Sequence, residues 1–384
     1  MLIRKMMTKH SFGMALAGGG ARGAYSAGIL RYLFTELPKH LGYIPWPELV
    51  SGTSVGALNG YFAATQSLWE IQRCHEIWTQ FTVEDVYLFP FKGIMHLLRD
   101  MKQASARTSL LDPSPLQELI TREAARRTIR QSIGSQKCRA FIVSATQLHT
   151  GKNVLFVDSN DPSYKILPPP QGALIHHKLY PEHLMGSAAI PLIFPPVCID
   201  GELYVDGGLR QNAPLHPLLH GNSNKILVLG TRVMKPLPIN TDTASLSLIA
   251  GKALNALTLD PVERDNLVAQ NINRIIDWGT RNYGPEFASQ LRNDTGFQTI
   301  DIMHVRPSQD LGKLAVECYS SEKVKGSKSL KWFLDRLFEQ GKSSGESDLL
   351  SHLLFDRCYT GPAEELGFQD SKKREDEFLE FFGK

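Results

Sequence analysis

The stretch Gly52-Thr53-Ser54-Val55-Gly56 decides how this chain folds around its chemistry. It has the G-x-S-x-G pattern of a nucleophile elbow, in which a serine stands at a sharp turn from a strand into a helix. We expect the strand at residues 48–51 and the helix at residues 55–65, where small side chains would let the helix pack closely on a sheet. Glycines 52 and 56 would make room for the turn, with Ser54 as the nucleophile and the backbone N–H of Val55 as an oxyanion donor.

A second glycine-rich turn, Gly18-Gly19-Gly20-Ala21-Arg22-Gly23, comes earlier in the chain. Apolar residues 12–17 predict a strand before it, and the spacing of apolar side chains predicts a helix at residues 25–37 after it. A serine nucleophile needs donors that stabilise the oxyanion formed when it attacks a carbonyl. We therefore interpret the turn as an oxyanion hole, with the backbone N–H groups of Gly19 and Gly20 as donors and Arg22 holding the turn.

This turn has two other interpretations. Gly18, Gly20 and Gly23 also satisfy the G-x-G-x-x-G dinucleotide fingerprint, which needs a carboxylate about 20 residues further on, at the end of a second strand. Glu36 has nearly that spacing, but it lies late in the first expected helix, just before Pro38, where it could not meet a ribose. A plain tight turn is the other alternative. A P-loop is excluded, because no lysine followed by serine or threonine closes the glycine run.

Asp206-Gly207-Gly208 supplies the carboxylate that the serine needs. Asp-Gly is also common in Asx turns, which is the structural alternative. An aspartate that accepts the serine proton directly needs a pKa raised by an apolar site, or a geometry that holds the proton. A histidine relay would replace it, with His149, His176, His177, His183 and His216 as the histidines considered. None of them stands in a comparable motif, so we expect a Ser54/Asp206 dyad.

Strands and helices alternate through the first 230 residues. This alternation predicts the α/β class, with a largely parallel sheet covered by helices on both faces. The further expected strands are residues 139–144, 153–157, 203–205 and 225–230. The further expected helices are residues 68–81, 115–130 and 181–188.

The pattern changes after Thr231, and a domain boundary is expected near residue 232. Residues 12–232 would form the catalytic domain, and residues 233–384 a mainly helical extension packed on it. The helices expected there are residues 245–257, 261–277 and 329–340, with one strand at residues 299–305. Residues 341–348, rich in serine and glycine, predict a flexible loop, and charged residues 371–377 predict the start of a solvated helix.

Together these motifs resemble those of the patatin-like phospholipases, which carry G-G-G-x-R-G, then G-x-S-x-G, then D-G-G or D-G-A. All three are present here in that order, and the resemblance spans residues 12–232. Supporting matches are Ser187-Ala188-Ala189-Ile190-Pro191, Phe194-Pro195-Pro196 and Asn212-Ala213-Pro214, and Leu353-Leu354-Phe355 and Glu365-Leu366-Gly367 look similar to the extensions of bacterial members. The resemblance implies a three-layer α/β/α fold, the Ser54/Asp206 dyad, oxyanion donors from Gly18 to Gly20, and lipid acyl ester hydrolysis without a metal or other cofactor.

Composition limits the classes of partner. The 384 residues contain 42 Lys plus Arg against 39 Asp plus Glu, and the net charge of +3 is too small to indicate nucleic acid. The five cysteines never form a C-x-x-C pair and look like reduced structural thiols. No run approaches the roughly 18 to 20 apolar residues that span a bilayer, and we expect no signal peptide. The expected location is the cytoplasm or a membrane periphery, with export without a cleavable signal left open.

One segment points to lipid independently of the resemblance. Residues 86–98 are rich in large apolar side chains, including Phe89 and Phe91, and are bordered by lysine and arginine. Such a segment could lie at a membrane interface or cover an acyl channel, and packing on the core is the alternative. In the first case, replacing Phe89 and Phe91 by serine would weaken vesicle binding and leave hydrolysis of a short soluble ester intact.

The expected function is that of a lipid acyl hydrolase of the phospholipase A or lysophospholipase type. Ser54 would attack an acyl ester carbonyl, and Asp206 would accept the proton and later activate water. The alternatives are a thioesterase or acyltransferase that uses the same serine, and a non-catalytic protein that binds lipid. Headgroup preference, oligomeric state and any need for an activator are left open by the sequence.

Overall fold

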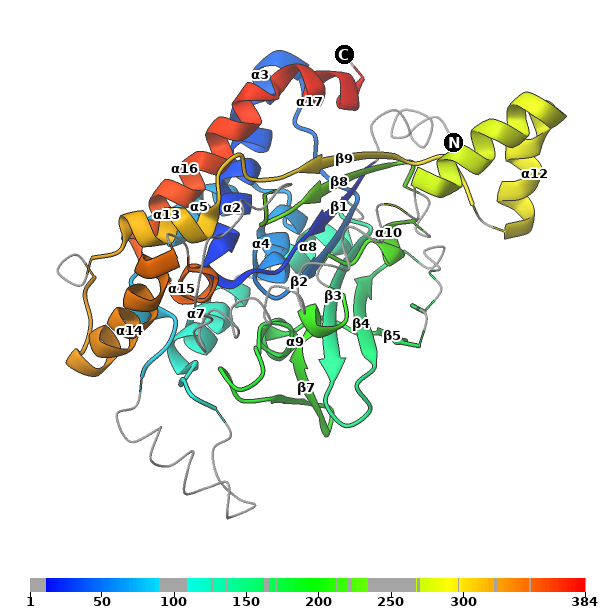
Figure 1. Cartoon of the computed structure of the whole chain (residues 1–384). Coiled ribbons are helices and arrows are strands. Elements are labelled where there is room, and N and C mark those ends of the chain that lie inside the picture. The colour runs from blue at the N-terminus through cyan, green and yellow to red at the C-terminus, as the bar shows by residue number, and fades with distance from the viewer. Residues whose placement is uncertain are drawn as a thin grey trace.

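A nine-stranded sheet runs through the part of the molecule that the structure describes (Figure 1). The structure is a computed structural model, and it describes residues 12–89, 109–125, 128–135, 137–161, 166, 168, 169, 171–211, 213–219, 223–233, 267, 270–295, 297–320, 324–344 and 347–383. The strand order is β5-β4-β3-β2-β1-β8-β9, and β7 pairs with both β3 and β6. The strands are β1 Gly13–Leu16, β2 Leu49–Thr53, β3 Ala140–Gln147, β4 Asn153–Ser159, β5 Ala173–His176, β6 Val197–Ile199, β7 Glu202–Asp206, β8 Lys225–Leu229 and β9 Asp301–Val305.

Most neighbouring strands are parallel, as the alternation of strands and helices predicts. β1 lies parallel to β2 and β8, β2 to β3, and β8 to β9. β3 is antiparallel to β4 and to β7, and β7 is antiparallel to β6. Every strand expected from the sequence is present, with its ends shifted by a few residues. β5 and β6 were not expected, because both are too short to show a clear apolar alternation.

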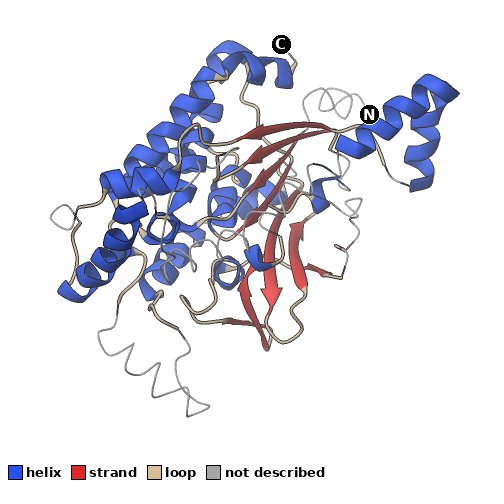
Figure 2. Ribbon diagram, viewed as in Figure 1, coloured by secondary structure: helices blue, strands red, loops and turns tan. Residues whose placement is uncertain are grey.

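Helices cover both faces of the sheet (Figure 2). In the first part of the chain these are α2 Gly23–Arg31, α3 Pro38–Leu41, α4 Val55–Ala64, α5 Leu68–Gln80, α7 Ser114–Ala124, α8 Thr128–Gly134, α9 Pro181–Ser187 and α10 His216–Leu219. The sides of β1 show how the two faces differ. Met14 and Leu16 belong to the large core that includes α2 and α4, whereas Ala15 packs on the opposite face with Leu215 and Leu218 at α10.

Two expected helices differ in detail from the observed ones. The helix expected at residues 25–37 begins at Gly23 and ends in a π-helical turn, Tyr32–Glu36. The helix expected at residues 115–130 is in fact two helices, α7 and α8. The other helices expected before residue 232 are present as α4, α5 and α9, and the fold is of the α/β class with a mostly parallel central sheet.

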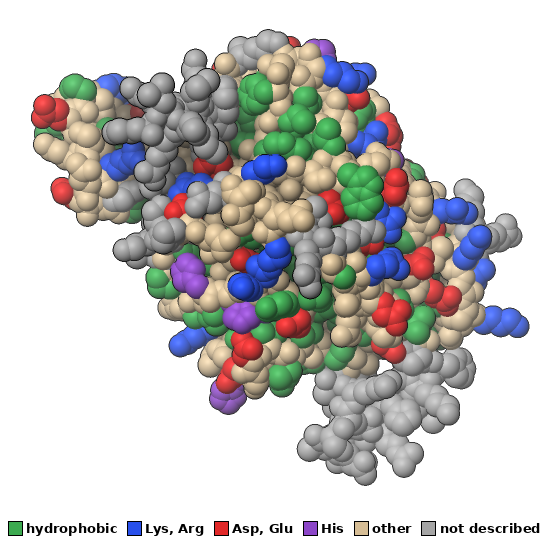
Figure 3. Space-filling model, turned by 180° about the vertical axis from the view of Figure 1, so that it is seen from behind, with side chains coloured by type: hydrophobic (Ala, Val, Ile, Leu, Met, Phe, Trp, Pro, Cys, Tyr) green, Lys and Arg blue, Asp and Glu red, His purple; other side chains and the backbone are tan. Residues whose placement is uncertain are grey.

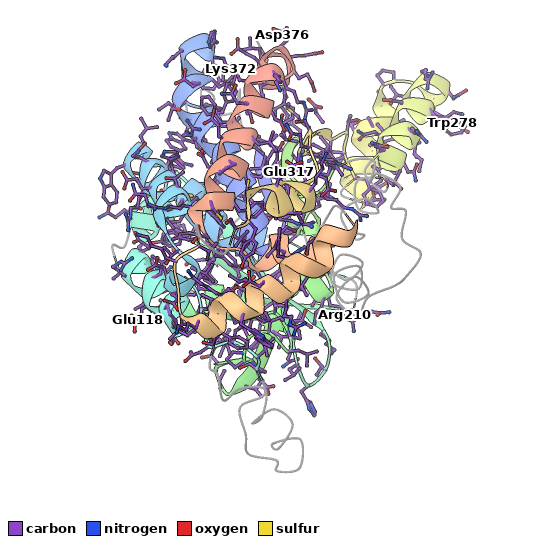
Figure 4. The ribbon with its side chains drawn as sticks, turned by 60° about the vertical axis from the view of Figure 1, so that its left-hand side comes forward. Glu118, Arg210, Trp278, Glu317, Lys372 and Asp376 are labelled. Atoms are coloured by element: carbon purple, nitrogen blue, oxygen red, sulfur yellow. The ribbon has the colours of Figure 1, made fainter. Side chains whose placement is uncertain are left out.

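The later part of the chain contributes a strand and several helices to the same body. β9 lies at the edge of the central sheet, beside β8. The helices are α12 Glu286–Thr295, α13 Leu311–Cys318, α14 Lys328–Ser344, α15 Asp348–Leu353, α16 Arg357–Lys373 and α17 Glu375–Phe382. α12 projects away from the sheet together with helical residues 270–283, and Figure 4 labels Trp278 in this projection.

α16 packs along α2 so closely that the two backbones touch (Figure 1). A Cβ at Gly28 would lie 1.8 Å from the carbonyl oxygen of Glu364, and a Cβ at Gly367 would lie 2.0 Å from that of Tyr25. Only glycine fits at two such crossing points. The sequence did not predict α16, because Gly361, Pro362 and Gly367 inside it are helix-breaking signals.

Some expectations for the later part were wrong or cannot be compared. Residues 341–348 are not a loop throughout, since α14 continues to Ser344 and Asp348 begins α15. Residues 371–377 span the junction of α16 and α17: Ser371 is fully buried, but residues 372, 373, 376 and 377 are exposed and Glu375 begins α17, so the expected solvated helix start is present. The helix expected at residues 245–257 lies outside the described residues, as do residues 261–266, 268 and 269 of the one expected at 261–277, whose described residues, 267 and 270–277, are helical. No described helix has the length and apolar character needed to cross a bilayer.

Candidate active site

Ser54 stands at the turn between β2 and α4. Its backbone has φ 54° and ψ −131°, a left-handed conformation that is strained for any residue other than glycine. A Cβ at Gly52 would lie 2.4 Å from the Gly56 carbonyl oxygen, and a Cβ at Gly56 would lie 2.2 Å from the Leu16 carbonyl oxygen. Both glycines of the G-x-S-x-G motif are therefore required by backbone that approaches them closely, as a nucleophile elbow needs.

Ser187 holds the elbow from α9. The Ser54 backbone N–H donates to the Ser187 hydroxyl at 2.8 Å, and that hydroxyl donates to the Ser144 carbonyl oxygen at 2.6 Å. Ser187 is fully buried. The sequence singled it out only as part of Ser187-Ala188-Ala189-Ile190-Pro191 and gave it no role, because a contact across 133 positions leaves no local signal.

Asp206 lies at the end of β7, within reach of the serine. Its carboxyl group accepts a hydrogen bond from the Gly208 backbone N–H at 2.7 Å, and the Ser54 side chain lies where it can donate a second one. Burial raises the pKa of Asp206 to about 6, although both hydrogen bonds act to lower it. A Cβ at Gly207 would lie 2.4 Å from the Ser144 carbonyl oxygen, so this glycine lets the aspartate loop approach β3. The bond from Gly208 is that of an Asx turn, the structural alternative for Asp206, and it is present together with the contact with Ser54.

A chain of buried polar side chains fixes the strands behind Ser54 and Asp206. Thr146 donates to the Asp206 carbonyl oxygen at 3.0 Å, and Thr53 donates to the Gln211 carbonyl oxygen at 2.8 Å. Asn153 connects the two sides, since it accepts from Ser144 and donates to the Gln211 side chain, each at 2.9 Å. Sequence reasoning missed these residues. Polar side chains inside strands that are otherwise apolar were the available signal.

The glycine turn lies directly beside the elbow. β1 and β2 pair with Leu16 opposite Gly52, so the two turns leave neighbouring strand ends. A Cβ at Gly23 would lie 2.4 Å from a methyl group of Val55, which shows how closely the turns approach each other. Gly19 and Gly20 have φ of 152° and 56°, and the Gly18 carbonyl oxygen accepts from Thr231 at 2.8 Å.

Arg22 anchors this turn through partners that the sequence did not suggest. Its guanidinium donates to Ser351 at 2.8 Å and to Asp348 at 2.7 Å, both in α15. The Arg22 side chain is only 4% exposed. The C-terminal part of the chain thus contacts the glycine turn.

The residues of the alternative interpretations, the relay histidines and Glu36, are not among the residues that line the cavity at Ser54. His183 accepts from the Tyr180 backbone N–H at the start of α9 and packs its ring edge-to-face on Phe156. No histidine is among the described residues that line the cavity next to Ser54. Glu36, the carboxylate that a dinucleotide site would need, pairs with exposed Lys39 at 2.7 Å and does not follow a second strand.

Ser54 and Gly20 line an apolar cavity of about 80 Å³. The cavity extends between α4, α5, α7 and α9. Its apolar lining includes Leu58, Phe62, Trp78, Leu116, Ile120, Leu184, Ile190, Phe194 and Phe355. Glu123 is the charged residue among the lining residues, and it pairs with Arg73 at 3.1 Å. Such a shape suits a long apolar group whose reactive end lies at Ser54.

Three of the four described residues of segment 86–98 pack on the core, and Leu88 is exposed. Val86, Tyr87 and Phe89 are buried, and Phe89 stacks on Phe333 with ring centroids 4.9 Å apart. Phe91 lies outside the described residues. Replacing Phe89 by serine would therefore disturb folding, and the core-packing alternative holds for residues 86, 87 and 89.

Charged side chains do not form a field of one sign on the face seen in Figure 3. Lysines and arginines alternate there with aspartates and glutamates over the described surface. This agrees with the small net charge of the chain. Among the described residues, no cluster of three or more histidine, cysteine, aspartate or glutamate side chains could hold a metal ion.

A mostly parallel sheet, a serine on a strained strand-to-helix turn and a buried aspartate beside it have the geometry found in α/β proteins with a nucleophile elbow. The profile of a family described as "Patatin-like phospholipase" matches residues 14–219, more than half of the chain. The chain belongs to this family of lipid acyl hydrolases.

Individual relatives are more distant. A cGAMP-activated phospholipase from Pseudomonas aeruginosa is 26% identical over 242 residues, which make up 63% of this chain and 66% of that protein. Among solved structures, VipD from Legionella pneumophila aligns over 93% of this chain and 91% of its own, at 12% identity and a TM-score of 0.30. Human GIVD cytosolic phospholipase A2 aligns over 97% of this chain and 62% of its own, at 12% identity and a TM-score of 0.42.

Proposed function

We propose that this chain is a serine acyl hydrolase that cleaves lipid acyl esters, with Ser54 as nucleophile and Asp206 as base. The observation that carries the proposal is the placement of the Ser54 side chain, on a strained turn, beside the buried Asp206 carboxyl group and next to an apolar cavity that Ser54 lines. A serine hydroxyl becomes nucleophilic when a positioned base takes its proton. A base pKa of about 6 suits this task near neutral pH, because the carboxylate is ionised yet still basic.

The reaction would run in two steps. Ser54 Oγ attacks the ester carbonyl carbon, its proton passes to Asp206, and the backbone N–H groups of Gly19, Gly20 and Val55 stabilise the oxyanion. The ester C–O bond then breaks, and Asp206 returns the proton to the leaving alcohol, which leaves an acyl-serine. Water, deprotonated by Asp206, attacks this second ester, releases a fatty acid and restores Ser54.

The cavity favours a lipid acyl chain over a small soluble ester. Its lining is almost entirely apolar, and Glu123 is neutralised by Arg73. An acyl chain inside it would place its carbonyl at Ser54 and leave the headgroup outside. This supports a phospholipase A or lysophospholipase, acting on a lipid substrate at a membrane or in a micelle.

A fluorophosphonate probe tests the nucleophile. We expect covalent labelling of the wild-type chain at the peptide that contains Ser54, no labelling of Ser54→Ala, and normal labelling of Ser289→Ala, which changes an exposed serine in α12. Intact mass and peptide mapping provide the readout. Because one relative is a cGAMP-activated phospholipase, labelling is measured with and without cGAMP. Labelling at another residue, or equal labelling of Ser54→Ala, would contradict the proposal.

The substrate class is tested next with phospholipids, lysophospholipids and acyl thioesters. Release of fatty acid from the oxygen esters is expected, at a higher rate than from thioesters. Transfer of the acyl group to an added alcohol would instead indicate an acyltransferase. Vesicle binding without consumption, in a chain that also resists labelling, would indicate a lipid-binding protein.

A further inference from the structure

The glycine turn is attached to α15, a helix that lies outside the residues matched by the family profile. Arg22, the last residue of the short 3-10 helix Gly20–Arg22, points its guanidinium at α15. Its Nε donates to the Ser351 hydroxyl at 2.8 Å, and its Nη2 forms an ion pair with Asp348 at 2.7 Å. The side chains of Arg22 and Asp348 are 4% and 10% exposed, so the pair is shielded from water.

α15 is itself a well-fixed anchor. The Ser347 side chain caps its first turn by accepting from the Leu350 backbone N–H at 3.1 Å. The Ser351 hydroxyl also donates to the Asp348 carbonyl oxygen at 2.7 Å, and the Leu353 carbonyl oxygen accepts from the Tyr87 hydroxyl at 2.7 Å. The groups that hold Arg22 therefore have little freedom to follow it if it moves.

A second contact joins the same helix to the backbone of the turn. A Cβ at Gly20 would lie only 2.2 Å from the His352 carbonyl oxygen, and Gly20 has a positive φ of 56°. His352 is buried, and burial together with the nearby charge of Arg22 lowers its pKa to about 3. Phe355, two residues after α15, lines the cavity together with Gly20 and Ser54. The C-terminal segment thus contacts the turn at Gly20 and at Arg22 and contributes Phe355 to the cavity wall beside it.

A buried guanidinium is tolerated only when carboxylate and hydroxyl partners replace its water. If Asp348 loses its charge, the lowest-energy response is for Arg22 to shift toward solvent, and the backbone that carries it must shift too. A displacement of about 1 Å in a positioned group can lower a rate by about 100-fold. The amides of Gly19 and Gly20 lie three and two positions before Arg22, so a shift of the Arg22 backbone would displace them directly.

We propose that Asp348 and Ser351 are positioning residues for the acyl-transfer site: through Arg22 they hold the glycine turn in the geometry that its backbone N–H groups need to bind the oxyanion. The proposal rests on the function proposed above. It assigns the C-terminal region a role in the reaction step rather than in substrate binding alone.

The test compares Asp348→Asn and Ser351→Ala with the wild-type full chain on a soluble short-chain ester. For Asp348→Asn we expect kcat to fall by about 10- to 100-fold while KM stays within about twofold, because the oxyanion interaction belongs to the transition state. For Ser351→Ala, which keeps the ion pair, we expect a fall of about threefold to tenfold. Glu317→Gln is the matched control, since it removes a carboxylate from an exposed pair with Lys313 on α13, where Figure 4 labels Glu317.

Hydrogen exchange supplies a readout that needs no activity. Faster exchange is expected for the amides of residues 18–23 in Asp348→Asn, with unchanged exchange at residues 52–56 of the elbow. Unchanged kcat together with unchanged exchange at the turn would overturn the proposal. A lower kcat accompanied by a similarly raised KM and by faster exchange at the elbow amides would also overturn it. If Asp348→Asn fails to fold, a wild-type kcat in folded Ser351→Ala decides against the proposal. Failure of the proposed function is seen separately, as absence of Ser54 labelling in the wild-type chain.

Discussion

The two glycine-rich turns of this protein look alike in sequence but are held in different ways. The elbow around Ser54 is fixed by residues up to position 211: Gly52 and Gly56 lie against nearby backbone, Ser187 accepts the Ser54 N–H, and the preceding Thr53 donates to Gln211. The turn around Gly20 is fixed by Thr231 and by α15, more than 300 positions further along the chain. Two motifs that meet in one site can therefore depend on different parts of the fold.

The difference has a physical origin. The elbow's strain is local to one residue, Ser54, at the junction of β2 and α4, so a short motif is sufficient to describe it. The glycine turn carries a buried cation, and a buried cation needs a counter-ion from wherever the fold can supply one. Here the counter-ion is Asp348, which lies in the region that we expected from the sequence to be a C-terminal extension.

The largest effect on stability is expected when a methyl group is added to each of the two turns. Gly56→Ala would place a Cβ 2.2 Å from the Leu16 carbonyl oxygen, and Gly20→Ala would place one 2.2 Å from that of His352. Each should lower the free energy of unfolding by about 4 kcal/mol, because fixed backbone cannot yield and Gly20 also has a positive φ. Urea denaturation measures the loss.

Gly361→Ala is the control for these variants, since a Cβ there meets no atom within 4 Å in helix α16. It should be neutral or stabilising by about 0.5 to 1 kcal/mol, as expected when alanine replaces glycine inside a helix. If Gly20→Ala proved as harmless as Gly361→Ala, the close contact between the turn and α15 would be disproved.

The pH dependence of labelling tests the role of Asp206 separately from the way the two turns are held. With the pKa of Asp206 near 6, the rate of labelling at Ser54 should fall about tenfold for each unit of pH below about 6, because a protonated carboxyl cannot accept the serine proton. Asp206→Asn should label slowly at every pH. A wild-type profile that stays flat down to pH about 4 would remove Asp206 as the base.

The same shift makes a prediction for stability. The pKa of Asp206 in the folded protein lies above its ordinary value of 3.8, so the folded state binds the proton more tightly than the unfolded state. This group therefore contributes stability at low pH, and the contribution is lost as the pH rises from about 4 to about 6. Asp206→Asn should be more stable than the wild type above this range, measured as the midpoint of urea denaturation.

The smallest effect is expected at the support of the elbow. Ser187→Ala removes the acceptor of the Ser54 N–H and the donor to the Ser144 carbonyl oxygen, both buried. We expect a loss of about 1 to 3 kcal/mol in the free energy of unfolding. Labelling at Ser54 should slow by about tenfold, a smaller loss than that of the dyad variants. Exchange of the glycine-turn amides should stay unchanged, because α15 holds that turn; a change there equal to that at the elbow would mean that the two turns are not held independently.

The sequence by itself determined most of the elements before residue 232 and the residues that we propose to be reactive. The parallel strands, the helix after each turn, and the residues Ser54 and Asp206 follow from short patterns: apolar runs, glycine spacing and a lone carboxylate beside two glycines. Each pattern is written within a few positions of the chain, because it reflects the local needs of a tight turn or a buried strand.

Only the tertiary structure decided which distant residues support them. Ser187, Asn153, Asp348 and Ser351 are ordinary polar residues in the sequence, and their roles arise because folding brings them to buried donors and charges that water can no longer satisfy. Helix α16 could not be predicted from the sequence for a related reason. Its glycines and proline weaken the local helix signal, while Gly28 and Gly367 allow the close packing on α2 that stabilises it.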